Sequence, residues 1–255
     1  MAHRPETSDL EPRTPDLGLR TSDLISAWLA HLFTASGVLC VFFATTSIFE
    51  HDYRAAFYWM AAQVAIDAVD GVIARRARVK EVLPWFNGAK MDDIIDYGSY
   101  VFVPALFVWV ALLVPDAWLL PVVAAMLLSS LYGFNTDKAK TDDHYFTGFP
   151  SYWNIAVLYI YLGGWRAELN AAVLLALAVL VFVPIKWIYP SRMTRLAVPT
   201  NVLGAAWAVL MLIMLWRYPA VPPTLFMASW IFPVYYAGLS LALNWRHGRL
   251  RGRTA

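Results

Sequence analysis

Residues 67–96 have the sequence DAVDGVIARRARVKEVLPWFNGAKMDDIID, which places carboxylates at the adjoining ends of two apolar segments. A short basic connection, residues 75–80, separates these two ends. Carboxylates at membrane depth are costly unless they are paired or bound to a metal, so they mark a candidate functional site. The acidic residues of this stretch that need an explanation are Asp67, Asp70, Asp92, Asp93 and Asp96.

The composition around this stretch is that of a membrane protein. Of the 255 residues, 60% are hydrophobic and only 15% are charged, whereas about a quarter are charged in an ordinary globular domain. The mean hydropathy is +0.53. The single cysteine, Cys40, excludes an internal disulfide and a cysteine metal cluster, and we interpret it as a small buried hydrophobe.

Eight apolar stretches reach or approach the roughly 20 residues that a helix needs to cross the bilayer core. The sequence therefore predicts an all-α fold, a polytopic membrane bundle of about eight transmembrane helices, with six or seven spans as the alternative. The predicted spans are residues 25–49, 54–75, 90–114, 117–135, 152–165, 169–187, 198–216 and 224–244.

The 20 lysines and arginines lie almost entirely on one side of these spans, since only Arg54, Arg166 and Arg217 fall on the other side. Basic residues accumulate in cytoplasmic segments, so we expect both termini and the 67–96 connection in the cytoplasm. Nucleic-acid binding by the basic C-terminus is disfavoured, because it has no interleaved aromatic stacking positions. The predicted regions are a disordered cytoplasmic tail (1–22), a transmembrane domain (23–245) and a basic cytoplasmic tail (246–255).

The acids share helix faces with small residues, because positions three, four and seven residues apart lie on one side of a helix. The two helices run in opposite directions from their connection, and each acidic face extends about 12 Å into the membrane. Both pairs of acids therefore reach a similar depth. The two faces hold Asp67, Asp70, Gly71 and Ala74 on the first helix and Gly88, Asp92, Asp96 and Tyr100 on the second.

Four converging carboxylates repel one another unless cations neutralise them. A donor set made only of oxygen favours hard ions such as Mg²⁺ or Mn²⁺, which bind carboxylates together with substrate phosphates. The small residues leave space for a ligand against the backbone. Arg75, where the first helix meets the connection, can bind phosphate. The alternative is a set of helix-end acids that are solvated or that pair with Arg75, Arg76 and Lys90.

The patterns D-x2-D-G-x2-A-R at 67–75 and G-x3-D-x3-D at 88–96 resemble the signature of the CDP-alcohol phosphotransferase family at every position. Members of that family transfer a substituted phosphate from a CDP-linked donor to an alcohol. The segment between the two patterns is longer than in most of the family and is similar to the bacterial phosphatidylcholine synthase branch. Three further stretches agree with that branch: HLFTASG at 31–37, YFTGFPSYWN at 145–154 and FVPIKWIYPSR at 182–192.

The resemblance implies transfer of the phosphatidyl group from CDP-diacylglycerol to choline, with release of CMP, by a six-helix core plus two helices. It also implies two divalent metal ions (Mn²⁺ or Mg²⁺), a homodimer, and a place in the bacterial inner membrane with the site facing the cytoplasm. By motif position, the metal ligands would be Asp67, Asp70, Asp92 and Asp96, with Asp96 also the general base. The nucleotide site would comprise Asp67, Gly71, Ala74, Arg75 and Gly88.

Choline carries a quaternary ammonium group that cannot donate a hydrogen bond, so we expect aromatic faces and a nearby carboxylate to bind it. For each aromatic side chain, anchoring at the membrane interface is the alternative. His31 and Thr34 are polar groups in the first span, either packed between helices or lining the site. The choline candidates are Asp93, Tyr100, Tyr145, Phe146, Phe149, Tyr152 and Trp153; the candidates for the lipid phosphate are Arg192 and Arg195, near Lys186.

Other functions remain open at this point. Within the family, serine, inositol phosphate or glycerol phosphate could replace choline, although the two phosphates favour a basic pocket. An intramembrane prenyltransferase would usually need a second acidic cluster, yet no Asp or Glu follows Glu168. A transporter would favour charges at the bilayer midplane and repeated halves. These acids gather instead at one end of one helix pair.

Overall fold

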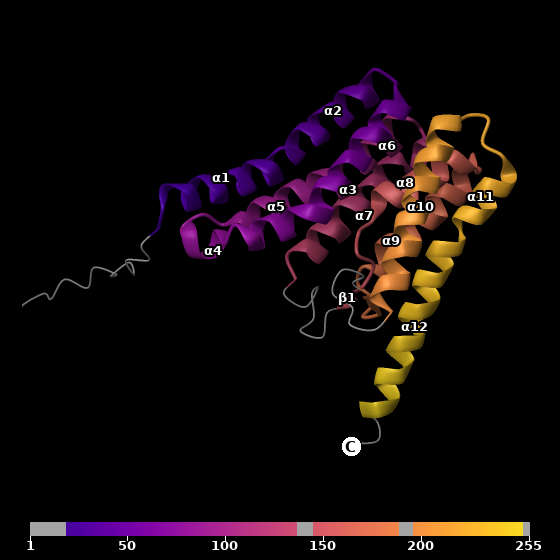
Figure 1. Ribbon diagram of the computed structural model, residues 1–255. Helices are drawn as coiled ribbons and strands as arrows, with labels where there is room; N and C mark the ends of the chain where they lie inside the picture. The colour runs from indigo at the N-terminus through magenta and orange to yellow at the C-terminus, as the bar shows by residue number, and fades with distance from the viewer. Residues whose placement is uncertain (1–18, 137–144, 189–195, 252–255) are drawn as a thin grey trace, which may run out of the picture.

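The computed structural model describes residues 19–136, 145–188 and 196–251 of the chain. Apart from two three-residue strands, the regular structure of these residues is helical, so the predicted all-α class is confirmed. In order along the chain (Figure 1), the elements are α1 (Thr21–Ala35), α2 (Gly37–Phe49), α3 (Tyr53–Arg76), α4 (Val79–Val82), α5 (Gly88–Asp96), the π-helix η1 (Tyr97–Phe102), α6 (Val103–Val110), α7 (Asp116–Phe134), β1 (Tyr145–Thr147), α8 (Trp153–Gly163), α9 (Ala167–Leu180), β2 (Lys186–Ile188), α10 (Ala197–Arg217), α11 (Pro223–Ser229) and α12 (Ile231–Arg251).

Six helical segments of the described chain are long and apolar enough to cross a membrane. Two further apolar helices, α8 and α9, are shorter, with 11 and 14 residues. Large apolar side chains cover the outside of the bundle, as Leu32, Phe42 and Trp216 illustrate with exposed fractions of 64%, 58% and 68%. A surface of this kind suits lipid, so the chain is a multi-pass membrane protein. The six segments are Thr21–Phe49, Tyr53–Arg76, Gly88–Val110, Asp116–Phe134, Ala197–Arg217 and Pro223–Leu243.

Several predicted spans are interrupted helices. The first span is divided at Ser36, whose hydroxyl donates to the Phe33 carbonyl (2.6 Å), into α1 and α2. Directly after this break, α2 and α3 approach closely, because a β-carbon at Gly37 would lie 2.1 Å from Oε1 of Gln63. The third span changes from α to π geometry after Asp96 and returns to α geometry at Val103.

The predicted helix at residues 169–187 is wrong at its end. α9 stops at Leu180, and Lys186–Ile188 form β2, which pairs antiparallel with β1. Pro184 explains the stop, because proline lacks the N–H that helix propagation requires and disfavours helical geometry in the residue before it. Gly148, directly after β1, packs against the end of α9. Its φ is +82°, and a side chain there would collide with the Val181 carbonyl.

The main buried core lies where α2, α3, η1, α6, α7, α8 and α9 meet, and Leu215 of α10 joins it. α1 packs against α3, α4 and α5, at the end where α3 and α5 are joined. α10, α11 and α12 lie on the other side of the bundle from α1 and α2 (Figure 1). Most of the predicted N-terminal tail and residues 252–255 fall outside the described residues, whereas α12 continues as a helix through Arg251.

Candidate functional site

Three of the predicted metal ligands form one cluster. Asp67 and Asp70 lie one turn apart on α3, and Asp92 faces them from α5. One carboxylate oxygen from each residue lies within 4.8 Å of the other two. Asp70 is buried, with 7% of its surface exposed, and the other two are half-buried. The antiparallel arrangement of α3 and α5, inferred from residue spacing, therefore brings these acids together.

The chemistry of this cluster fits a divalent metal ion. Three carboxylates at this separation repel one another, and a divalent cation relieves the repulsion without removing their charge. The donors are all oxygen, as hard ions such as Mg²⁺ and Mn²⁺ prefer. These two ions commonly keep open positions that water or substrate phosphate fills. Asp67, Asp70 and Asp92 are the residues that would hold the ion.

The other two acids of the stretch, Asp93 and Asp96, lie on the same helix as Asp92. Asp96 lies one turn after Asp92 at the end of α5 and is half-buried. Asp93 is exposed. The helix continues into η1 without a break after Asp96, and the Ser99 hydroxyl donates to the Asp96 main-chain carbonyl (3.3 Å). Asp96 therefore lies one turn further along the same helix than Asp92.

Tyr100 binds the cluster directly. Its hydroxyl donates a hydrogen bond of 2.7 Å to Oδ2 of Asp67. Its ring lies 6.2 Å from that of Tyr152, centroid to centroid, at an angle of 59°. The structure thus joins two residues proposed for choline, but it places the hydroxyl of one of them on a candidate metal ligand.

The small residues of the predicted nucleotide site are covered by other side chains. A β-carbon at Gly71 would lie 3.2 Å from Nη1 of Arg75, so the guanidinium folds back over this glycine. A β-carbon at Gly88 would lie 2.5 Å from Cε1 of His31. Ala74 is half-buried on the same helix as Gly71. Arg75 and His31 therefore stand over the two glycines where the sequence predicted free space for a ligand.

His31 belongs to an aromatic cluster at this end of the bundle. Its ring lies 4.5 Å from Phe86 and 6.1 Å from Trp28, centroid to centroid. It is 5% exposed, and its Nε2 has no hydrogen-bond partner among the described residues. Thr34, by contrast, bonds to the Ala30 carbonyl one turn earlier, which is a helix-packing role. Of His31 and Thr34, His31 is the one beside the acidic helices.

The aromatic segment before α8 is divided between core and site. Trp153 is completely buried, and its indole N–H donates to Oγ of Ser130 (2.6 Å), which also accepts from the Ser151 hydroxyl (3.0 Å). Phe149 packs edge-on against the Trp153 ring, with centroids 5.0 Å apart. A completely buried ring has no face open to choline, so Trp153 is a core residue here. Sequence reasoning missed Ser130, a serine in an apolar helix.

Some predicted site residues have no described side chain. Tyr145 and Phe146 lie in β1, where the main chain of Tyr145 is opposite Ile188 and that of Phe146 is opposite Trp187. Arg192 and Arg195, the candidates for the lipid phosphate, lie outside the described residues, and Lys186 is described only through its main chain in β2.

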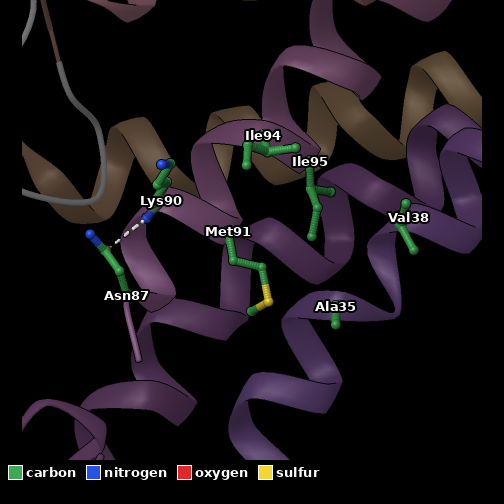
Figure 2. Close-up of a pocket in the computed structure, with 7 residues that line it drawn as sticks. All are labelled: Ala35, Val38, Asn87, Lys90, Met91, Ile94 and Ile95. Carbon is green, nitrogen blue, oxygen red and sulfur yellow. Dashed lines mark hydrogen bonds between the residues drawn. The ribbon is translucent and has the colours of Figure 1, made fainter. Parts of the chain in front are cut away.

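An apolar groove lies beside the acidic cluster, between the α1–α2 junction and α5. Its volume is about 370 Å³. Figure 2 shows Met91 and Ile95 pointing toward Ala35 and Val38, with Asn87 and Lys90 at one end. The Asn87 side chain caps α5 by accepting from the Lys90 main-chain N–H (3.0 Å). No acid lines this groove, and its apolar walls suit an acyl chain rather than a metal.

Comparisons with known proteins identify relatives over most of the chain, although no family model matches it. The chain is 44% identical to the phosphatidylcholine synthase of Legionella pneumophila over 172 residues, which is 67% of this chain and 68% of that protein. It is 32% identical to the phosphatidylcholine synthase of Pseudomonas aeruginosa over 235 residues, or 92% and 97% of the two chains. With the phosphatidylcholine synthase of Borreliella burgdorferi, the identity is 31% over 238 residues, or 92% and 100%.

Proposed function

Because the chain belongs to the phosphatidylcholine synthase family, we propose that it transfers the phosphatidyl group of CDP-diacylglycerol to choline and releases CMP. The observation that carries this proposal is the cluster of Asp67, Asp70 and Asp92 at the end of two membrane helices. The motifs on these helices support membership of the wider CDP-alcohol phosphotransferase family.

The proposed reaction is a displacement at phosphorus. The choline hydroxyl oxygen attacks the phosphorus that carries diacylglycerol, the bond from this phosphorus to the CMP oxygen breaks, and CMP leaves with the bonding electrons. Asp96 is the proposed general base that accepts the choline hydroxyl proton. Divalent ions, when bound, would neutralise the diphosphate and stabilise the charge that develops on CMP.

Asp67, Asp70 and Asp92 are the proposed ligands of the first ion, and Asp96 is proposed to contribute to a second. Mn²⁺ and Mg²⁺ both suit this donor set. Arg75 over Gly71 is well situated to bind a phosphate of the donor, since a guanidinium can make two parallel hydrogen bonds to phosphate oxygens. Asp67, Gly71, Ala74, Arg75 and Gly88 form the proposed nucleotide site.

Choline is proposed to bind between this cluster and the aromatic segment before α8. Tyr152 is the best supported aromatic contact, because its ring lies beside that of Tyr100. Asp93 is the proposed carboxylate partner of the ammonium group. Phe149, Tyr145 and Phe146 stay candidates, whereas the buried Trp153 is not carried into the proposal. Arg192 and Arg195 remain the proposed contacts of the lipid phosphate.

We further propose that α8 and α9 complete eight membrane crossings, with both termini and the acidic site on the cytoplasmic side of the bacterial inner membrane. The distribution of lysine and arginine supports this orientation. The homodimer stays a proposal that rests on the family resemblance. The proposed regions are still a tail at 1–22, a membrane domain at 23–245 and a basic tail at 246–255.

The test is to offer the purified protein CDP-diacylglycerol together with choline, serine, inositol phosphate or glycerol phosphate, each in a separate reaction. We expect phosphatidylcholine and CMP in equal amounts from the choline reaction and no lipid product from the others. A chelator should abolish turnover, and added Mn²⁺ or Mg²⁺ should restore it. Turnover of another alcohol but not of choline would overturn the substrate assignment, and turnover that survives the chelator would overturn the metal mechanism.

A further inference from the structure

We propose that Tyr100 is a positioning residue that fixes the carboxylate of Asp67 for metal binding. Its hydroxyl lies 2.7 Å from Oδ2 of Asp67, and the two residues belong to different helices, η1 and α3. The inference rests on the metal site of the proposed function. It differs from the expectation that Tyr100 contributes an aromatic face to choline.

The contact is of a strong kind. A phenol that donates to a carboxylate forms a charge-assisted hydrogen bond, which is shorter and stronger than one between neutral groups. The donated proton occupies one acceptor site of Oδ2, and the remaining acceptor sites of the carboxylate then have a defined direction. Hydrogen-bond partners of metal ligands commonly change metal affinity by about 10-fold to 100-fold, because they fix the orientation of the ligand.

Tyr100 belongs to the π-helix that directly follows the acids. η1 begins at the residue after Asp96, so the helix that carries Asp92 and Asp96 widens immediately beyond the acids. A π segment accommodates an additional residue per turn and so redirects the side chains that follow it. Tyr97, at the start of η1, donates its hydroxyl to the Leu127 carbonyl of α7 (3.0 Å), whereas Tyr100 donates to Asp67. The two tyrosines of η1 thus bind two different neighbouring helices, α7 and α3.

The segment before α8 supports the ring of Tyr100. This ring packs near Tyr152, and the residues on both sides of Tyr152 bind to one buried hydroxyl, that of Ser130 on α7. A continuous set of contacts therefore runs from α7 through the start of α8 to Tyr100 and Asp67. Through this set, the aromatic segment supports the geometry of the acids.

Tyr100→Phe is the direct test, because it removes the hydroxyl and keeps the ring. We expect the dissociation constant of Mn²⁺, measured from the electron paramagnetic resonance signal of free Mn²⁺ without substrates, to rise about 10-fold to 100-fold. The Mn²⁺ concentration for half-maximal activity should rise by a similar factor. At saturating Mn²⁺, the KM for choline should change less than about twofold.

Tyr97→Phe is the matched control, since it removes a comparable hydroxyl in the same π segment whose bond points away from the acids. It should leave the Mn²⁺ dissociation constant unchanged. Replacing Tyr100 with 4-aminophenylalanine restores a donor and should recover Mn²⁺ affinity, whereas 4-methylphenylalanine, of similar size but without a donor, should not. These two variants make the same comparison should Tyr100→Phe fail to fold.

The outcomes separate the possible roles. Wild-type Mn²⁺ affinity in Tyr100→Phe would overturn the positioning role, and a raised KM for choline in that variant would assign Tyr100 to choline instead. Failure of the wild-type protein to bind Mn²⁺ or Mg²⁺ would overturn the metal site of the proposed function, and this inference with it. Normal metal binding without choline turnover would overturn the proposed activity while leaving the role of Tyr100 intact.

Discussion

Gly88 has no side chain, and the ring of His31 fills the place that a side chain would take. The sequence predicted that small residues at 71 and 88 allow a ligand to approach the helix backbone closely. It did not reveal that His31 and Arg75 make that approach. The spacing of small residues shows where a helix can be approached, but the approaching group comes from the packing of α1 or from the rotamer of Arg75.

Gly88→Ala should disturb the site through His31. Its methyl group would lie 2.5 Å from Cε1 of a buried ring, so the ring or the start of α5 must move. Overpacking of this kind costs about 1–3 kcal/mol. We expect a lower midpoint of thermal unfolding and a raised KM for CDP-diacylglycerol. Gly98→Ala is the control, because its β-carbon would meet Val41 at an ordinary 3.5 Å; equal effects of both changes would contradict the role of His31.

Substitutions of Asp92 and Asp96 should separate Mn²⁺ binding from catalytic turnover. Asp92 belongs to the cluster of three, so Asp92→Asn should raise the dissociation constant of the first Mn²⁺ by more than about 10-fold. Asp96 is the proposed base, so Asp96→Asn should lower kcat by about 10²-fold to 10⁴-fold while the first Mn²⁺ still binds. Calorimetric Mn²⁺ titration beside a turnover assay measures both effects. Loss of all Mn²⁺ binding in Asp96→Asn would contradict this division.

At the scale of elements, the lengths of the apolar stretches predicted where the helices lie but not how they are interrupted. The spans at 54–75 and 117–135 match α3 and α7 to within a residue. The π geometry of η1 left no mark on the pattern, since an added residue in an apolar helix changes direction without changing composition. α9 ends seven residues early because Pro184 outweighs the apolar run that contains it.

The start of α8 depends on one hydroxyl of α7. Ser130→Ala leaves the buried Trp153 indole N–H without its acceptor, and an unsatisfied buried donor costs about 1–3 kcal/mol. We expect a lower midpoint of thermal unfolding together with a raised KM for choline, because Tyr152 lies between the two residues that Ser130 binds. The neighbouring Ser129→Ala removes only a bond to the Met126 carbonyl of its own helix and should change neither quantity. A raised KM in both variants would count against this link.

At the scale of the whole molecule, charge distribution predicts an orientation and hydropathy predicts a membrane bundle. Contacts between distant segments escaped prediction, because neither property encodes which buried side chains meet. The bonds from Tyr100 to Asp67 and from Trp153 to Ser130 are of this kind. The acids of the cluster were predictable, since two short motifs on adjoining helices brought them together before any distant contact was needed.

Cysteine labelling in a Cys40→Ala background tests the eight-span arrangement. Arg78 and Arg166 are exposed, and lie in the α3–α5 connection and just before α9. A membrane-impermeant maleimide should label Arg166→Cys in intact cells, because eight crossings place it on the outer side. Arg78→Cys should react only in inverted membrane vesicles. Arg166→Cys that is inert from outside would favour six crossings, with α8 and α9 inside the bundle.

The shortness of α8 sets the depth of the proposed reaction. Eleven residues span about 16 Å, roughly half of the hydrocarbon core, so one end of this helix stops well inside the bilayer. In the proposed topology that end is Trp153, next to Tyr152, whose ring lies beside Tyr100. In the proposed orientation, the polar boundary of the cytoplasmic leaflet would then dip toward the acids. Choline can approach by water and the donor by lipid, so each substrate remains in its own phase until the two meet.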